Sequence, residues 1–199
     1  MATEVVDENG HPVRGRKGYL VCTAPAPSMT RGIWNDPQRY LDTYWSRWPG
    51  VWVHGDWVRV DEDGFWYILG RSDDTLNIAG KRIGPAEVES ALTAHPAVSE
   101  DAAIGVPHEI KGEVIVCFAV LRPGHESSEA LGEELKQTAA GYLGKALAPE
   151  AVYFVRDLPK TRNAKVMRRM NSARALGYDP GDVSSLENPQ AVEEIPRIR

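Results

Sequence analysis

The segment Pro159–Arg169, PKTRNAKVMRR, holds five cations and no carboxylate, although the net charge of the chain is -5. The acid-free stretch runs from 158 to 178 and contains Lys160, Arg162, Lys165, Arg168, Arg169 and Arg174. A run of like charges is most often a solvated helix face. Here, however, Pro159 and the triplet Thr161–Asn163 favour a loop for the first cations. The segment therefore also fits a site for a small anionic ligand.

Lys165 is the cation of this segment that we expect to carry chemistry. The spacing of Val166, Met167, Met170 and Ala173 predicts a helix that begins near Lys165 and turns one face to a core. A flexible ammonium at the junction of a loop and a helix can be delivered to an anion. We interpret the lack of nearby carboxylates as a sign that these cations serve an anionic site, because local acids would neutralise them. For Arg168 and Arg169, one turn into the helix, we expect instead that they anchor the domain or meet an acidic surface.

The stretch Gly70–Glu89, GRSDDTLNIAGKRIGPAEVE, is the second candidate. Its three glycines permit sharp backbone changes and close approach of a ligand to the main chain. Asp73 and Asp74 have no third ligand at useful spacing, so we favour a surface turn and predict no metal site. Earlier in the chain, Asp56 lies in a β-rich run between tryptophans. A carboxylate there needs a polar partner, and the hydroxyls of a sugar would suit it.

Two parts of the chain must position these residues, because the composition changes near residue 73. All six tryptophans precede that point. Apolar, β-rich runs predict strands over 17–24, 51–60 and 65–70. A helix is predicted over 35–47, between the first two of these strands. The sequence DEDG, Asp61–Gly64, predicts a hairpin turn between the last two strands, because Asp-Gly supplies a residue with positive φ.

After residue 73, strands and helices alternate. We predict helices over 84–95, with Pro85 in the first turn, and over 127–147, with a serine start. Strands are predicted over 98–107, 113–121 and 151–155. This order predicts an α+β fold: a β-rich part over 1–72, a sheet-and-helix domain over 73–177 and a surface tail over 178–199.

Composition limits the classes of function. The apolar and charged fractions are those of an ordinary globular protein. No apolar run is long enough to span a bilayer and no signal peptide is recognisable, so we expect a cytoplasmic protein without a membrane partner. Cys22 and Cys117 lie far apart in apolar runs and read as buried free thiols. The net acidic charge argues against nucleic acid as a partner.

Two long motifs carry a resemblance to a known family. The first, HGDWVRVDEDGFWYILGRSDDTLNIAGKRIGPAEVESAL, covers 54–92, and the second, LPKTRNAKVMRR, covers 158–169. Both resemble the acetyl-CoA synthetase branch of the adenylate-forming enzymes, in the same order and at the same separation. The resemblance extends from about Tyr19 into the tail and covers only the C-terminal part of such enzymes. Their phosphate loop and acid pocket are absent from this sequence, which indicates a fragment that is inactive alone.

The resemblance implies an AMP-forming acyl-CoA synthetase. Such an enzyme joins a carboxylate to ATP, releases pyrophosphate, and transfers the acyl group from the acyl-adenylate to coenzyme A. We expect a short- or medium-chain acid, ATP, AMP and coenzyme A as small-molecule substrates, and Mg²⁺ bound with ATP mainly outside this chain. By the same resemblance Asp56 would accept hydrogen bonds from the ribose of ATP, and Arg71 would assist there. Lys165 would bridge the carboxylate and the α-phosphate during adenylation.

The family also rotates a small C-terminal domain between the two half-reactions. By resemblance, Asp73 would be the hinge of this rotation. Gly80 would line the thiol tunnel, where a side chain would block pantetheine, and Arg82 would lie near the phosphate or coenzyme A. A hinge needs few residues between two compact cores, and the change in composition near residue 73 fits that requirement.

The sequence departs from the family pattern at two places. Asn163 and Ala164 stand where the family has a small residue and glycine before the lysine, and alanine resists positive φ. Ala140 stands where an arginine often contacts the nucleotide of coenzyme A, so Lys111 or Lys145 would have to substitute.

Two other functions stay open. The chain could belong to an adenylate-forming enzyme that loads the pantetheine of a carrier protein, or it could be a non-catalytic accessory or interaction domain. In every case residues 1–72 resemble a piece of a larger sheet whose remaining strands lie upstream. We therefore expect exposed strand edges there and self-association through this part.

Overall fold

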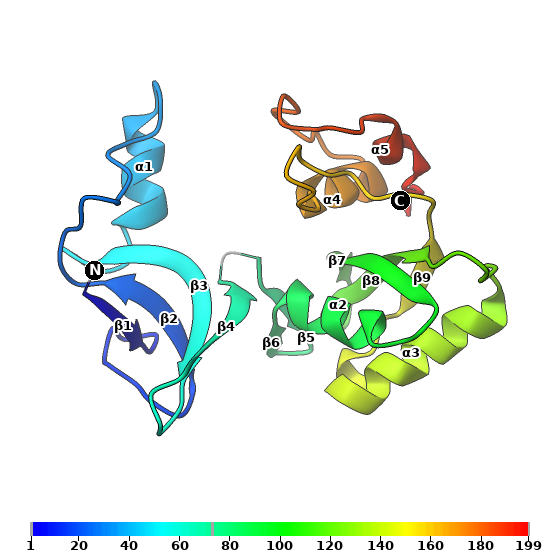
Figure 1. Ribbon diagram of the computed structural model, residues 1–199, viewed down its shortest axis with the longest axis horizontal. Helices are drawn as coiled ribbons and strands as arrows, with labels where there is room; N and C mark the ends of the chain where they lie inside the picture. Colours follow the sequence, from blue (N-terminus) through cyan, green and yellow to red (C-terminus); the bar gives the residue numbers. More distant parts are fainter. Residues whose placement is uncertain (1, 73, 199) are drawn as a thin grey trace. The chain divides into compact units, whose positions relative to one another are not determined.

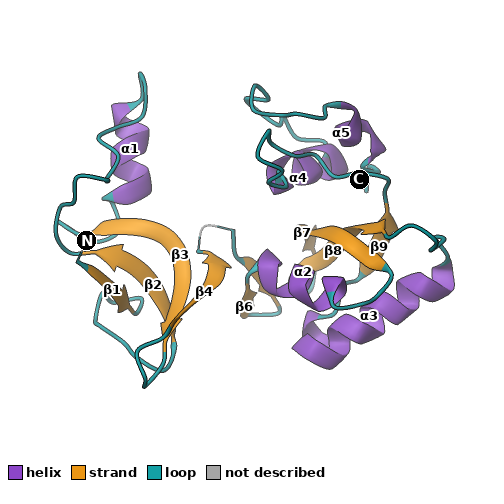
Figure 2. Ribbon diagram, in the orientation of Figure 1, coloured by secondary structure: helices purple, strands orange, loops and turns teal. Residues whose placement is uncertain are grey.

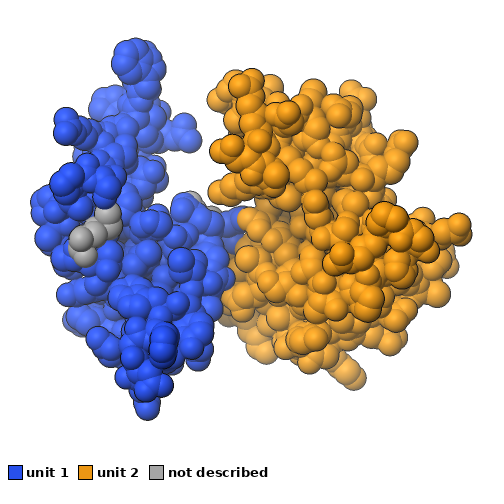
Figure 3. Space-filling model, viewed as in Figure 1, with its two compact units in different colours: residues 1–74 blue, residues 75–199 orange. Residues whose placement is uncertain are grey.

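The computed structural model describes residues 2–72 and 74–198. The chain forms two compact units, residues 1–74 and 75–199 (Figures 1 and 3). The predicted α+β fold is confirmed, since both units combine sheets with helices. No helix within the described ranges is long and apolar enough to cross a membrane.

The first unit is a four-stranded antiparallel sheet with one helix. The strands, in their spatial order, are β1 (Thr3–Val6), β2 (Lys17–Cys22), β3 (Trp52–Val60) and β4 (Trp66–Arg71). The helix is α1 (Pro37–Tyr44), whose N-terminus is capped by the side chain of Asp36. Strands β2, β3 and β4 and helix α1 were predicted and are confirmed. Strand β1 was not predicted, because its four residues, TEVV, are few and show no alternation of polar and apolar side chains.

The hairpin between β3 and β4 turns at the predicted DEDG sequence. Gly64 has φ +88°, which a residue with a side chain rarely adopts. The Asp61 carboxylate accepts a hydrogen bond of 2.8 Å from the backbone N–H of Phe65, and the Asp61 N–H bonds the Phe65 carbonyl. The turn therefore fixes the register in which β4 returns along β3.

Aromatic side chains pack the first unit only in part. Trp52 and Trp57 are buried, and the ring of Trp57 lies 4.1 Å from that of Tyr19, between centroids. Packing was predicted for this stripe and is confirmed at these residues. Trp34 and the run 65–68 remain exposed.

The second unit has three layers. Its sheet has the order β6 (Lys81–Ile83), β5 (Leu76–Ile78), β8 (Gly112–Leu121), β7 (Val98–His108), and β9 (Ala151–Phe154) lies parallel to β8. One face packs against α2 (Pro85–Thr93), α3 (Glu129–Leu143) and the short 3-10 helix η1 (Lys145–Leu147). The other face packs against α4 (Arg168–Leu176) and the segment of α5 (Gln190–Glu194), as Figure 2 shows.

Strand β8 lies in the middle of these layers. Its side chains alternate: Ile115 and Cys117 face α2 and α3, whereas Val116 and Phe118 face the opposite core. A strand buried on both faces reads as a continuous apolar run, which is how β8 appears in the sequence. Cys117 is buried and free, as is Cys22, so the prediction of two buried thiols is confirmed.

Most elements of the second unit match the predictions from sequence. Pro85 occupies the first turn of α2, and Ser128 caps α3 by accepting a hydrogen bond of 3.1 Å from the N–H of Leu131. In the segment predicted as a surface tail, 178–199, most residues up to 187 are exposed. Ala191 and Ile195, further along this segment, are buried. Ile195 packs into the core on one face of the sheet of the second unit.

Candidate functional site

The basic segment begins with an ordered hairpin loop. Lys160 and Val166 form an antiparallel bridge, and the N–H of Met167 donates to the carbonyl of Pro159 over 2.8 Å. Helix α4 therefore begins at Arg168, and the prediction of a helix starting near Lys165 is wrong by three residues. The reason is that the backbone between 165 and 167 bonds across the hairpin instead of along a helix.

The tip of this loop is a tight turn. The N–H of Thr161 donates to the carbonyl of Lys165 over 2.9 Å, and the N–H of Ala164 donates to the carbonyl of Thr161 over 2.8 Å. Ala164 has φ +57°, in the left-handed region, which favours glycine. A side chain in this conformation costs about 1–2 kcal/mol. The turn therefore holds strain immediately before Lys165.

Lys160 is paired, contrary to the interpretation that these cations lack carboxylate partners. Its Nζ lies 2.7 Å from Oε2 of Glu100 and 3.0 Å from Oδ1 of Asp157. Burial alone would lower the pKa of Lys160, but the hydrogen bonds to the two carboxylates outweigh burial and raise it. Lys160 is therefore a structural anchor of the loop.

The two arginines that open α4 are also engaged. Arg168 forms a two-pronged ion pair with Glu89 of α2, in which Nε lies 2.6 Å from Oε1. The guanidinium of Arg169 donates to the carbonyls of Pro180, over 2.6 Å, and Asp182. These partners are distant in sequence, so the acid-free stretch did not reveal them. The inference that the cations serve an anionic ligand is wrong for Lys160. The expectation that Arg168 and Arg169 anchor the domain or meet an acidic surface is confirmed by these contacts.

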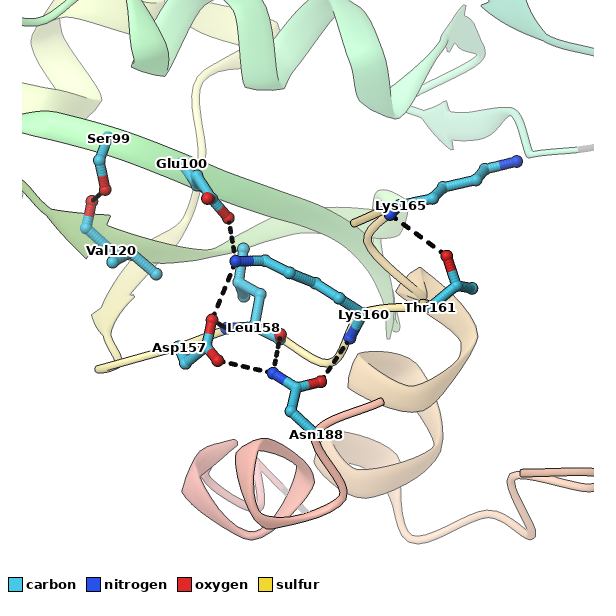
Figure 4. A network of polar contacts seen from close by, with 9 residues as sticks. All are labelled: Ser99, Glu100, Val120, Asp157, Leu158, Lys160, Thr161, Lys165 and Asn188. Carbon is cyan, nitrogen blue, oxygen red and sulfur yellow. Dashed lines mark hydrogen bonds and ion pairs between the residues drawn. The ribbon is translucent and has the colours of Figure 1, made fainter. Parts of the chain in front are cut away.

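Two cations remain exposed at the loop tip, Arg162 and Lys165. Within residues 2–72 and 74–198, their head groups form no ion pair and no hydrogen bond. Figure 4 shows the Lys165 side chain extending away from the contacts that hold the base of the loop. The backbone of Lys165 is nevertheless fixed, because its N–H donates to Oγ1 of Thr161 over 3.2 Å. Such an amine is available to an incoming anion.

A second polar cluster lies in the first unit, on β3 and β4. Asp56 pairs in register with Arg71, and one Asp56 oxygen lies 3.7 Å from Nη1 of that arginine. The other Asp56 oxygen lies 2.7 Å from Nδ1 of His54. At Gly55, φ is +92°, and an added Cβ would lie 2.6 Å from Nη2 of Arg71. The glycine therefore makes room for the arginine beside the carboxylate.

His54 was not among the predicted site residues. Its signal was present, because residues i and i+2 of a strand face the same way, which puts His54 and Asp56 side by side. The sequence predicted a polar partner for Asp56, and two of its partners are side chains of this chain, His54 and Arg71. The cluster offers a carboxylate, an imidazole and a guanidinium, which together can accept and donate hydrogen bonds to a hydroxylated ligand.

Gly80 lies in the turn between β5 and β6. Ile78 and Lys81 are paired, so Ala79 and Gly80 form a two-residue loop, and both have positive φ, +49° and +79°. These angles belong to a type I′ turn, which matches the twist of a hairpin. A Cβ added at Gly80 would meet no atom within 4 Å. The turn gives a folding reason for Gly80, and its role toward a thiol ligand stays a prediction.

The other predicted residues lie on the same hairpin, elsewhere on the second unit or outside the described part. Arg82 is exposed on β6, two residues beyond Gly80. Asp73, the predicted hinge, lies outside the described residues. Lys111 pairs with Glu150 at 3.0 Å on the surface. No group of three or more His, Cys, Asp or Glu side chains in the described ranges is arranged to hold a metal ion.

One acid of the second unit is buried without a hydrogen bond. Asp101 on β7 is 7% exposed, and within the described residues neither carboxylate oxygen has a hydrogen-bond partner. Burial, the largest cause, and the charge of Glu89 raise the pKa of Asp101, whereas Arg168 lowers it, and together they bring this pKa to about 8. The two charges that act on this acid, Glu89 and Arg168, form the ion pair that joins α2 and α4.

Comparison with known proteins identifies relatives of nearly the whole chain. Residues 87–165 match the family described as AMP-binding enzyme C-terminal domain. The acetyl-coenzyme A synthetase of Pyrobaculum aerophilum is 49% identical over 195 residues, which are 98% of this chain and 29% of the relative. The 3-hydroxypropionyl-coenzyme A synthetase of Sulfurisphaera tokodaii is 44% identical over 195 residues, 96% of this chain and 29% of the relative.

A solved structure agrees with these relatives. Acetoacetyl-CoA synthetase from Streptomyces lividans superposes with a TM-score of 0.83 and 32% identity, over 96% of this chain and 29% of that protein. The chain therefore spans less than a third of the length of the proteins it matches. The family match ends at Lys165, at the tip of the loop described above.

Proposed function

We propose that this chain, which corresponds to the C-terminal portion of the acetyl-CoA synthetase-like, AMP-forming acyl-CoA synthetases, completes the active site of an acid–thiol ligase. The reaction converts a carboxylate, ATP and coenzyme A into acyl-CoA, AMP and pyrophosphate. The observation that carries this proposal is Lys165: an exposed amine on an ordered loop, without a carboxylate partner among the described residues.

In the first half-reaction Lys165 serves as the adenylation cation. The acid substrate and the α-phosphate of ATP are both anions, and their repulsion opposes attack at phosphorus. An ammonium between them offsets this repulsion and stabilises the negative charge that develops in the transition state. A lysine suits this task because its flexible stem can enter and leave a site more easily than the planar fork of arginine.

The His54, Asp56 and Arg71 cluster binds the nucleotide in this proposal. Asp56 accepts hydrogen bonds from the ribose hydroxyls, and Arg71 donates to the ribose. His54, at 2.7 Å from Asp56, fixes the orientation of the carboxylate. Mg²⁺ enters with ATP and is held mainly outside this chain.

The second half-reaction uses another part of the second unit. After adenylation, rotation of residues 75–199 about a hinge at Asp73 withdraws Lys165 and brings the β5–β6 turn to the thiol. Gly80 then gives clearance for pantetheine, and Arg82 meets a phosphate of the substrate. Both residues belong to one hairpin, so a single movement delivers them together.

The acid substrate is short in this proposal. The relatives are named for acetyl, 3-hydroxypropionyl and acetoacetyl groups. The residues that would shape the acid pocket lie in the part of those proteins that this chain does not match, so these names suggest a size class and no single acid.

The test uses the complete enzyme, meaning this chain joined to the upstream region that its relatives possess. Acetate, 3-hydroxypropionate, acetoacetate and longer acids are each supplied with ATP, Mg²⁺ and coenzyme A. The proposal predicts pyrophosphate, AMP and acyl-CoA in equal amounts with at least one short acid. Formation of ADP, or of acyl-adenylate that is never transferred to coenzyme A, would contradict it. Transfer to a carrier protein instead would favour the carrier-loading alternative.

A further inference from the structure

The loop that presents Lys165 is held by the C-terminal tail. Thr161 and Leu186 form an antiparallel bridge, and the N–H of Glu187 donates to the carbonyl of Lys160 over 2.8 Å. Residues 186–188 therefore lie along the first arm of the hairpin loop, opposite the arm that carries Lys165. The tail acts as a third strand on this small hairpin.

Asn188 secures this arrangement with its side chain. Its Nδ2 donates to Oδ2 of Asp157 over 2.6 Å and to the carbonyl of Leu158 over 2.9 Å, and its Oδ1 accepts from the N–H of Lys160 over 2.8 Å (Figure 4). The residue is 9% exposed. An amide group has both donors and an acceptor, so neither aspartate nor a hydroxyl residue can make all three bonds.

The same base is anchored to the sheet. The ammonium of Lys160 bridges Asp157 and Glu100, which lies on β7. Asp157 thus receives a hydrogen bond from Asn188 and another from Lys160. Burial would raise the pKa of Asp157, but these hydrogen bonds outweigh it and lower the pKa. The tail, the loop and the sheet therefore meet at one carboxylate.

We propose that Asn188 is a positioning residue for adenylation: it holds the base of the 159–167 loop so that Lys165 is presented in one place. This inference rests on the proposed function of Lys165. The amine of Lys165 has no partner of its own among the described residues, so its position depends on the backbone beneath it. That backbone bonds across the hairpin to the arm that Asn188 fixes.

The proposal predicts a selective loss of one half-reaction. A displacement of about 1 Å at a reacting group costs on the order of 10²-fold in rate. In the complete enzyme, Asn188→Ala should therefore slow adenylation by about that factor. Thioester formation from added acyl-adenylate should remain within about twofold, because Lys165 is not used in that step.

A matched control separates loosening of the tail from loss of positioning. Glu194, in α5 of the same tail, accepts from the N–H of Arg156 over 3.0 Å and contacts its guanidinium at 3.2 Å. Glu194→Ala removes these contacts and leaves the loop untouched, so both half-reactions should persist. Hydrogen exchange on the 199-residue chain supplies a readout besides activity. Asn188→Ala should accelerate exchange at the N–H groups of Lys160 and Thr161, with α2 and α3 unchanged.

Should Asn188→Ala unfold the second unit, Lys160→Met provides the same test, because it removes the anchoring ammonium and keeps the apolar stem. Selective loss of adenylation in either folded variant, with faster exchange in the loop, supports the inference. Equal loss of both half-reactions, or adenylation at the rate of Glu194→Ala, would overturn it. Lys165→Ala run beside them distinguishes the two proposals: if that variant still adenylates, the proposed function itself fails.

Discussion

Asp101 provides a prediction that can be measured on this chain directly. It lies buried on β7, where the charges of the ion-paired Glu89 and Arg168 act on it, and within the described residues its oxygens have no hydrogen-bond partner. Burial and the charge of Glu89 raise the pKa of Asp101, and the smaller effect of Arg168 does not offset them, so this pKa is about 8. The folded chain therefore keeps a proton that the unfolded chain releases.

The sign follows from this difference in bound protons. Because the pKa of Asp101 is higher in the folded chain than in the unfolded one, its contribution to the free energy of unfolding is fully present below about pH 4. This contribution is lost as the pH rises through about 8. Within this window the free energy of unfolding falls by about 1.4 kcal/mol per pH unit. Between about pH 5 and pH 7, Asp101 alone should thus cost the second unit about 3 kcal/mol. Asp101→Asn, which carries no charge, should remove this loss.

Urea unfolding at about pH 5 and pH 7 measures the effect. All six tryptophans belong to the first unit, so fluorescence follows that unit and far-UV circular dichroism adds the second. The gain in stability of Asp101→Asn over the wild type should be about 3 kcal/mol larger at the higher pH. Glu193→Gln, at an exposed position of α5, serves as the control. An Asp101→Asn gain that is the same at both pH values would refute the reasoning.

Three further predictions concern the loop, the turn and the first unit. Ala164→Gly should raise the free energy of unfolding of the second unit by about 1 kcal/mol, since φ is +57° there. Ala173→Gly inside α4, the control, should lower it by about 1 kcal/mol. A lower free energy of unfolding in both variants would contradict the account. Gly80→Leu should cost the second unit about 1–2 kcal/mol through the strained turn. In the complete enzyme it should also stop thioester formation while acyl-adenylate still forms, so equal loss of both half-reactions would leave Gly80 with a folding role only. The isolated chain should self-associate through residues 1–72, because Phe65 and, in β4, Trp66, Tyr67 and Ile68 are exposed. A monomer by sedimentation, with hydrogen exchange as slow in 1–72 as in 74–177, would contradict this.

Local patterns in the sequence predicted most of the fold. Strand β8 reads as a continuous apolar run because it is buried on both faces, and the serine before α3 marks a cap. The elements that were missed are short: β1 has four residues, β5 and β6 have three each, and α5 has five. Such segments have too few residues to show a period, and the short strands form through pairing with other strands of their sheets.

The sequence predicted a site residue only where both the chemical type of the residue and its position in a motif pointed to a role. Lys165, Asp56 and Arg71 stand in motifs, and the sequence names them without showing what they touch. Partners distant in sequence were invisible: Lys160 meets Glu100, and the residue that holds the loop, Asn188, lies beyond α4 in the tail. Folding, and not local charge balance, decides which cations are neutralised.

The helix boundary near Lys165 shows the same limit. Apolar spacing extended a helix back to Val166, and Met167, Met170 and Ala173 are indeed buried. Yet the backbone at 165–167 forms hydrogen bonds to the opposite arm of the hairpin. The spacing of apolar residues carries no information about such bonds. The outcome bears on the proposed function, because it puts Lys165 on a hairpin loop and not inside a helix.

The central claim is that Lys165 acts in adenylation alone, and the most direct measurement compares the two half-reactions in the complete enzyme carrying Lys165→Ala. Arg162→Ala, which removes the neighbouring exposed cation, is the matched control. The account predicts that Lys165→Ala lowers pyrophosphate release by several orders of magnitude and leaves acyl-CoA formation from added acyl-adenylate near that of the control. Adenylation that survives in Lys165→Ala, or a parallel fall of both half-reactions, would contradict it.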